Sequence, residues 1–390
     1  MVINLKYKRP LQEKNILKLF GLSLTIKIAI AVLTIVLVNA GLFNNGDDHL
    51  LWGNLSWQHI CEIYFNSDSG WYKVIAENGY AHVPLSESNN WSAPNLHFAF
   101  FPLFPMCIRT IMEISDMGFY SAAFCLNIIV LYPLVRYFYL FILHHGIESK
   151  HAFRGVVLFL LFPFSMHIYF IYTEALFFTL VLACFFFIAK KQWIKFAITA
   201  ALLTLTRPNG LILMIPFLLF MIETNGGFKW SNIKTFLRQP FLYSLVAMPL
   251  AFFVWMYVQQ AITGNWMASA AAQSGWKKHW MFPLLALFRN GFWQEQLASI
   301  YSIIIMLVAI YYYKKWAPSI NAFVWIIILL PLSAGSVISM TRYLSMLFPY
   351  YLHAAASQWM NRYYKTIMVL LIVLQFVVLK LWIEDNSLMY

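Results

Sequence analysis

The chain has 390 residues, of which 61% are hydrophobic, 18% are aromatic and only 11% are charged. Its mean hydropathy is +0.67 and its formal net charge is +12 at pH 7. Soluble domains usually carry about 25% charged residues, so this composition excludes a soluble globular protein. The lysines and arginines form short clusters between apolar runs, as membrane orientation requires. The positive charge therefore does not indicate a nucleic-acid partner.

The apolar residues form long runs, many of them close to the ~20 residues that a helix needs to cross a bilayer. Lipid offers no partner to backbone N–H and C=O groups, so these runs are expected to be helices. We predict an all-α, polytopic membrane protein with about eleven transmembrane helices, within a range of about 10–12. The predicted spans lie near residues 15–43, 119–143, 155–172, 174–189, 192–206, 209–223, 240–262, 297–313, 319–337, 343–359 and 365–383.

The segment 98–115, FAFFPLFPMCIRTIMEIS, is apolar but contains two prolines, Arg109 and Glu113. We interpret it as an interfacial or re-entrant helix, because the basic clusters then gather on one side of the membrane. In this topology the N-terminus lies in the cytoplasm. The whole chain is predicted to form one transmembrane domain, with a first extracytoplasmic loop at 44–118 and a second large one at 263–296.

The segments with unusual polar content all fall on the predicted non-cytoplasmic face. Charged groups at membrane depth are costly and usually serve a site. We therefore expect these segments to converge at the outer mouth of the helix bundle. They are 44–97, YTE at 172–174, TRPNG at 206–210, the loop 263–296 and SMTRY at 339–343.

Asp68 is the main candidate for a catalytic residue. It lies among aromatic residues that include Trp71 and Tyr72. Partial desolvation by such neighbours would raise the pKa of a carboxyl group and make it a better base. A second interpretation, compatible with the first, is that Asp68 caps a short interfacial helix that begins near Ser69.

Trp71 and Tyr72 have two open interpretations, as aromatic residues at the membrane surface or as a stacking platform for a sugar ring. Asp47 and Asp48 are alternative candidates for the acid, although their place in NNGDDH is typical of a solvated turn. The weaker candidates, which we interpret as solvated loop residues, are Glu77, His82 and His97.

Arg207 stands in TRPNG, where a proline and a glycine are expected to break the helix. A guanidinium at such a break is suited to hold a phosphate through two parallel hydrogen bonds, and Asn209 is a neighbouring candidate for substrate binding. Arg342 and Tyr343 have a similar setting in SMTRY. The alternative for Arg207 is an arginine that snorkels to the interface. Glu174 is predicted to pair with one of these arginines or to bind a hydroxyl group.

The sequence contains no Walker A, HExxH or Cys–His metal pattern. We therefore expect no metal and no other cofactor. The predicted inside loops are too short for a nucleotide-binding domain, so a donor substrate is expected to be lipid-borne and used outside. In the second outer loop, Lys277, Lys278 and His279 are expected to meet anionic headgroups, with a lipid phosphate as the alternative.

The stretch SDSGWYKVIAENGY, followed by FAFFPLFPM, resembles the PIG-V family of membrane mannosyltransferases. YTEALF, TRPNGLIL, TGNW and TRYLSMLFP stand in that family's order, so the resemblance extends from about residue 60 to 350. Two positions depart from the family pattern. Ser67 stands where tryptophan is usual, and Phe104 stands where tyrosine is usual. Ser67 removes one aromatic neighbour from Asp68.

The resemblance implies a GT-C fold with an active site on the periplasmic or lumenal face. Asp68 matches the motif aspartate that acts as catalytic base in that class. The resemblance also implies a polyprenyl- or dolichyl-phosphate sugar as donor, with mannose as the expected sugar. The other expected partners are the lipid bilayer and a glycan, glycolipid or protein acceptor. The predicted location is a bacterial plasma membrane, with the endoplasmic reticulum membrane as the alternative.

Two other functions remain open on the sequence alone, a transporter or flippase of a lipid-linked sugar and a noncatalytic partner in a glycosylation complex. A transporter needs polar residues throughout its bundle and access from both faces. Lys27 and Arg136 are the charges that lie well inside the predicted spans, and the polar motifs favour one face. These features favour an inverting glycosyltransferase.

Overall fold

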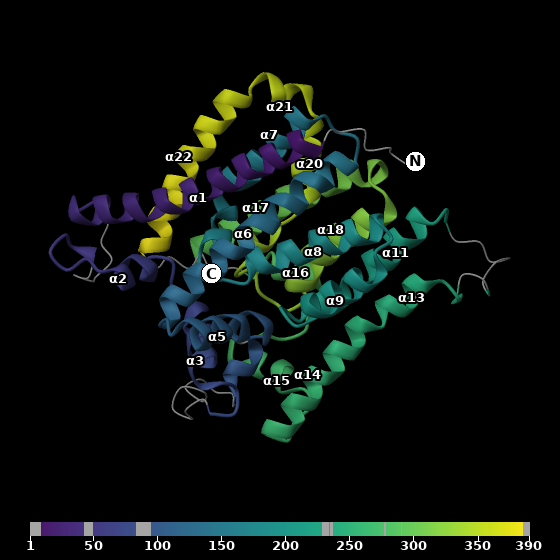
Figure 1. Cartoon of the computed structure of the whole chain (residues 1–390), viewed down its shortest axis with the longest axis horizontal. Coiled ribbons are helices and arrows are strands. Elements are labelled where there is room, and N and C mark those ends of the chain that lie inside the picture. Colours follow the sequence, from purple (N-terminus) through teal and green to yellow (C-terminus); the bar gives the residue numbers. More distant parts are fainter. Residues whose placement is uncertain are drawn as a thin grey trace. The chain divides into compact units, whose positions relative to one another are not determined.

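The computed structural model describes residues 9–42, 50–82, 95–227, 234, 237–276, 278–289 and 291–384. Helices, turns and loops account for all of these residues, and none of them is in a β-strand. The predicted all-α class is confirmed (Figure 1). The long helices satisfy most of their own backbone polar groups, as a lipid environment requires.

Within the described ranges, five helical segments are long and apolar enough to cross a membrane. They are Gln12–Asn39 within α1 (Arg9–Asn39), α6 (Phe119–His144), Pro240–Thr263 over α13 (Pro240–Leu245) and α14 (Ala247–Thr263), Trp293–Lys315 over α17 (Trp293–Tyr312) and η6 (Tyr313–Lys315), and α22 (Tyr364–Ile383). A sixth results if α7 (Ser149–Leu161) and η3 (Pro163–Tyr169), which are bent by 83°, form one span. The chain is therefore a multi-pass membrane protein.

Other predicted spans are shorter apolar helices, namely α8 (Glu174–Ala189), α9 (Trp193–Thr204), α10 (Asn209–Ile212) with α11 (Met214–Thr224), and α18 (Pro318–Leu332). The predicted span near 343–359 is divided into α19 (Met340–Ser345) and α20 (Phe348–Ala356). Length and composition therefore support five or six spans, and the count of eleven stays a prediction.

The segment 98–115 begins with the last two residues of η2 (Leu96–Ala99) and then contains α5 (Leu103–Ser115). A helix of 13 residues is about 20 Å long, shorter than the ~30 Å hydrocarbon core. Its length thus agrees with an interfacial or re-entrant helix. The other short helices are α2 (Trp57–Glu62), α3 (Ser69–Asn78), α15 (Ala268–Ala272), η5 (Gln273–Trp276), α16 (Pro283–Ala286) and α21 (Gln358–Arg362).

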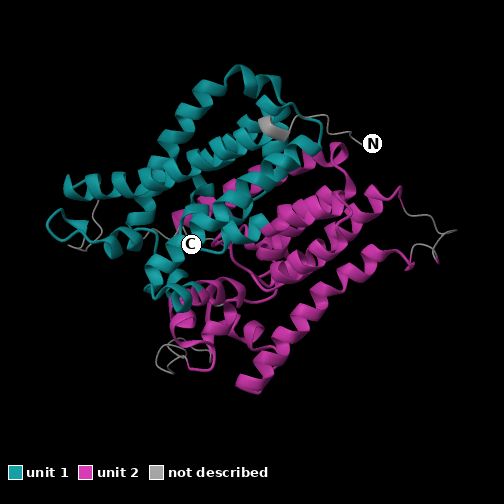
Figure 2. Ribbon diagram, viewed as in Figure 1, with its two compact units in different colours: residues 1–70, 111–179, 341–390 teal, residues 71–110, 180–340 magenta. Residues whose placement is uncertain are grey.

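The chain groups into two compact units, both made of separate stretches of sequence (Figure 2). Unit 1 comprises residues 1–70, 111–179 and 341–390, and unit 2 comprises residues 71–110 and 180–340. In unit 1, α1, α6 and α7 pack on one another and α20 packs on α7. In unit 2, α11 packs on α18 and α9 packs on α14.

A broken helix organises unit 1. Helix α7 ends before Pro163, which cannot donate a backbone hydrogen bond, and the chain continues as η3 and an irregular segment to residue 173. Four buried side chains donate to carbonyls along this path. They are Lys27 to Tyr169 (2.6 Å), Asn127 to Ile168 (2.8 Å), Ser69 to Ile171 (2.9 Å) and Gln375 to Leu160 (3.0 Å). Irregular backbone at membrane depth is tolerated only where protein satisfies it in this way.

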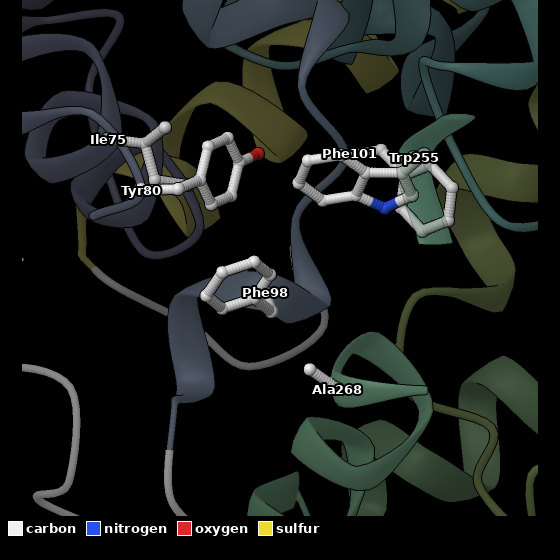
Figure 3. Close-up of a cluster of buried hydrophobic side chains, with 6 residues drawn as sticks. All are labelled: Ile75, Tyr80, Phe98, Phe101, Trp255 and Ala268. Carbon is white, nitrogen blue, oxygen red and sulfur yellow. The ribbon is translucent and has the colours of Figure 1, made fainter. Parts of the chain in front are cut away.

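Unit 2 contains a cluster of buried aromatic rings around Tyr80, Phe98 and Trp255 (Figure 3). The Tyr80 hydroxyl donates to the Phe100 carbonyl at 2.6 Å. His97 lies against this cluster with only 3% of its surface exposed, and its Nε2 is 3.1 Å from the Tyr80 carbonyl. The prediction that His97 is a solvated loop residue is therefore wrong. Burial lowers the pKa of His97 to about 4.

Candidate functional site

Arg342 is the centre of an ionic cluster in unit 1. Its Nη2 lies 2.8 Å from Oδ2 of Asp68, and its Nε lies 3.5 Å from Oε1 of Glu174. Asp68 precedes α3, Glu174 begins α8 and Arg342 belongs to α19, so three distant parts of the sequence meet here. The predicted pairing of Glu174 with an arginine is confirmed, whereas the contact between Asp68 and Arg342 was not predicted.

The guanidinium of Arg342 is buried, with 6% of the residue exposed. It lies over two aromatic rings, 5.0 Å from the Tyr172 centroid and 5.2 Å from the Tyr343 centroid. Burial opposes its charge, but Tyr343, Asp68 and Glu174 outweigh that effect and raise the pKa of Arg342 above its usual value. Arg342 is therefore a fixed positive charge at any physiological pH.

Two nitrogens of this guanidinium, Nη1 and Nε, are buried, and no described residue accepts a hydrogen bond from either. Nε still faces Glu174 at 3.5 Å, whereas Nη1 has no ionic partner among the described residues. A buried donor without an acceptor is unfavourable by roughly 1–3 kcal/mol. Such an atom is accordingly suited to receive an anionic ligand, and charge-assisted hydrogen bonds from arginine to phosphate are among the stronger ones in proteins.

Glu174 has no exposed surface. Two features of the structure favour its charged form there, the guanidinium of Arg342 and the N-terminus of α8, whose first residue it is. A carboxylate in the first turn of a helix is stabilised by the partial positive charge of that end. Glu174 is therefore a rigid, buried counter-charge for Arg342.

Asp68 is the accessible acid of the cluster, because 22% of its side chain remains exposed. It follows Ser67, which has a left-handed backbone with φ +48°. The Ser67 N–H donates to Oδ1 of Asn66 at 2.7 Å, which supports this conformation. Helix α3 then begins at Ser69, as predicted.

Four residues that were not candidate site residues lie around the cluster, namely Asn66, Phe170, Tyr172 and Trp382. The Tyr172 hydroxyl donates to the Asn66 carbonyl at 3.4 Å, so it ties the segment before Glu174 to the turn before Asp68. Trp382, at the end of α22, stacks on Phe170 with 3.7 Å between ring centroids and accepts a hydrogen bond from Asn66 through its carbonyl. Tyr172 lies within YTE, but no sequence pattern distinguishes Trp382.

Trp71 and Tyr72 belong to unit 2 and differ in their surroundings. Tyr72 is buried, with 5% exposed, and its ring meets Phe104 edge-on. Trp71 is half-buried and stacks on Phe100 at 5.8 Å, with Trp276 at 6.0 Å. Of the two, Trp71 has the more exposed side chain.

Arg207 and Asn209 also belong to unit 2 and lie half-buried where α9 gives way to α10. The predicted helix break is confirmed. A Cβ at Gly210 would lie 2.5 Å from the Leu203 carbonyl oxygen, so only glycine fits this close approach.

The remaining candidates have separate outcomes. Glu77 and His82 are exposed, as predicted. In the segment 263–296, Nη1 of Arg289 is 2.7 Å from Nε2 of His279. Asp47, Asp48 and Lys277 lie outside the residues that the structure describes.

The cluster combines an accessible carboxylate, able to take a proton, with a buried cation that has an N–H group directed at no acceptor. The fold and the cluster thus define an all-α, multi-pass membrane protein with a buried arginine–carboxylate site. No protein-family model matches this chain, and no curated protein matches its sequence.

Proposed function

We propose that this protein is an integral-membrane inverting glycosyltransferase that uses a lipid-phosphate sugar as donor. The observation that carries this proposal is the cluster of Asp68, Glu174 and Arg342. Transfer from such a donor requires a base for the acceptor hydroxyl and a cation for the departing phosphate. Asp68 and Arg342 have the chemistry for these two roles.

In the proposed reaction, the acceptor hydroxyl oxygen attacks the anomeric carbon while Asp68 takes its proton. The bond between the anomeric carbon and the phosphate oxygen breaks, and its electron pair leaves on the phosphate. The configuration at the anomeric carbon inverts because attack and departure occur on opposite faces. Arg342 stabilises the charge that accumulates on the phosphate.

The finer assignment rests on the motifs that resemble the PIG-V family. They support a GT-C fold, mannose as the sugar and a polyprenyl or dolichyl chain on the donor. The distribution of basic residues supports a site on the non-cytoplasmic face. The acceptor is a hydroxyl group of a glycan, a glycolipid or a protein.

The direct test is to incubate the purified protein with polyprenyl-phosphate mannose and measure released polyprenyl phosphate. The wild-type protein is expected to release it, and Asp68→Asn is expected to lower the rate by about 10²–10⁴-fold, the usual worth of a general base. Glu77→Gln is a matched control, since it neutralises an exposed acid on α3 and should leave the rate unchanged.

Two outcomes of that assay would contradict the proposal. Near-normal release by Asp68→Asn would move the base to another acid, such as Asp47 or Asp48. Passage of an intact lipid-linked sugar across sealed vesicles, without cleavage, would instead support the transporter or flippase.

A further inference from the structure

We infer that the donor phosphate displaces Asp68 from Arg342, so that Asp68 becomes available as a base only after the donor has bound. This inference rests on the proposed function and adds a regulation of the same site. It begins from the observation that the accessible acid is already engaged, with its Oδ2 2.8 Å from Nη2 of Arg342.

The neighbours of Arg342 leave one nitrogen of the guanidinium without a counter-ion. The ring centroids of Tyr172 and Tyr343 lie 5.0 and 5.2 Å from the central carbon of the guanidinium. Glu174 lies next to Nε. Nε and Nη1 both lack a hydrogen-bond acceptor among the described residues, but only Nη1 also lacks an ionic partner, because Nε faces Glu174. Nη2 lies against Asp68 and is 3.5 Å from the Tyr343 hydroxyl. A phosphate that binds an arginine bidentately uses two neighbouring nitrogens, which here are Nη1 and Nη2.

Binding at Nη1 and Nη2 brings the phosphate oxygens against Oδ2 of Asp68. Two anions that share one cation at this distance repel each other, and a low-dielectric site strengthens the repulsion. One carboxylate of the cluster must therefore withdraw from the guanidinium.

Asp68, rather than Glu174, is the carboxylate free to move. Glu174 has no exposed surface and is fixed at the first residue of α8. Asp68 lies on a turn with 22% of its side chain exposed, so water can solvate it when it leaves Arg342. The neighbouring Ser67 has φ +48°, a left-handed backbone conformation that is unfavourable for a residue other than glycine.

The displacement gives Asp68 two states, one paired with Arg342 and one available to accept a proton. A carboxylate bound to a guanidinium is a poor proton acceptor, because transfer of a proton to it would forfeit the ion pair. Once the phosphate holds Arg342, Asp68 can take the proton of the acceptor hydroxyl. The reaction is thereby coupled to the presence of donor, and the donor binds first.

The test measures phosphate binding to the full-length protein in detergent by calorimetry, with farnesyl phosphate as the probe. Asp68→Asn removes the competitor and should tighten binding on the order of tenfold, within the range usual for coupled sites. Glu174→Gln removes the same charge from the Nε position and should tighten binding less. Arg342→Lys retains a charge but not the two parallel donors, and should weaken binding.

Unchanged or weaker binding by Asp68→Asn would overturn the inference, and so would equal tightening by Asp68→Asn and Glu174→Gln, which would indicate a general effect of charge. Absence of farnesyl phosphate binding to the wild-type protein and to Asp68→Asn would also overturn it. Because this readout requires no turnover, failure of the proposed enzyme activity is seen separately, as uncleaved polyprenyl-phosphate mannose in the presence of tight phosphate binding.

Discussion

At the scale of single residues, Arg342 determines whether the cluster is stable. Its replacement by alanine would leave Asp68 and the fully buried Glu174 without their shared cation. Loss of one partner from a buried ion pair usually costs ~3–5 kcal/mol. We expect Arg342→Ala to lower the free energy of unfolding by about that amount, as measured by denaturation in detergent.

A double variant is the control for this prediction. Glu174→Gln removes the buried charge that Arg342 neutralises, so Arg342→Ala with Glu174→Gln should recover part of the lost stability. A loss below about 1 kcal/mol in Arg342→Ala, the typical value for a surface ion pair, would show that the cluster is not buried.

His97 gives a prediction for pH dependence. Its pKa is lowered from 6.5 to about 4 because burial disfavours the charged ring. Between these two values the folded state binds fewer protons than the unfolded state, so the free energy of unfolding falls as the pH is lowered from 6.5 to 4. Glutamine does not titrate, so thermal unfolding at several pH values should show that His97→Gln loses less stability than the wild type as the pH falls. An identical loss of stability in both proteins would assign it to other groups.

Residue-scale prediction from the sequence succeeded where a short motif carries its own chemistry. The acid in YTE pairs with an arginine, and α3 begins after Asp68, as expected. The contact of Asp68 with Arg342 depends on how separate segments fold together, which no local pattern encodes. The prediction that His97 is solvated was wrong for the same reason, because Tyr80 and the cluster around Trp255 bury it.

At the scale of elements, helix α18 depends on a cap from another helix. Ala317, before its first residue, offers no capping side chain. Glu223 of α11 accepts hydrogen bonds from the Ser319 backbone N–H at 2.8 Å and from the Ser319 hydroxyl at 2.6 Å. A carboxylate at this end also complements the helix dipole.

We expect Glu223→Ala to reduce the free energy of unfolding by about 0.5–2 kcal/mol, the usual cost of losing an N-cap. Glu223→Gln keeps an acceptor oxygen and should cost less. Chemical denaturation of both variants measures the difference. An alanine variant as stable as the glutamine variant would mean that water replaces the cap.

The positions of the helices were predicted from the sequence more accurately than their lengths. Proline and glycine correctly mark the break at residues 207–210, because their backbone chemistry acts locally. The bend of 83° after α7 was not predicted, since the apolar run continues through it. Buried polar groups from other helices, such as Lys27 and Asn127, satisfy its carbonyls, and these partners are not adjacent in sequence.

At the scale of the whole molecule, the orientation in the membrane is the main prediction. Basic clusters place Lys190 inside and the loop that contains Trp280 outside. In a background without the four native cysteines, a membrane-impermeant maleimide added to intact cells should label Trp280→Cys and not Lys190→Cys. Both residues are exposed, so broken cells should label both. The reverse pattern in intact cells would place the second outer loop in the cytoplasm.

A structure of the protein with a bound polyprenyl phosphate would show directly whether the phosphate displaces Asp68 from Arg342. We expect a phosphate oxygen within about 3 Å of Nη1 of Arg342, with Oδ2 of Asp68 withdrawn from Nη2 and Glu174 still beside Nε. A phosphate bound elsewhere, with the ion pair between Asp68 and Arg342 intact at its 2.8 Å separation, would contradict it.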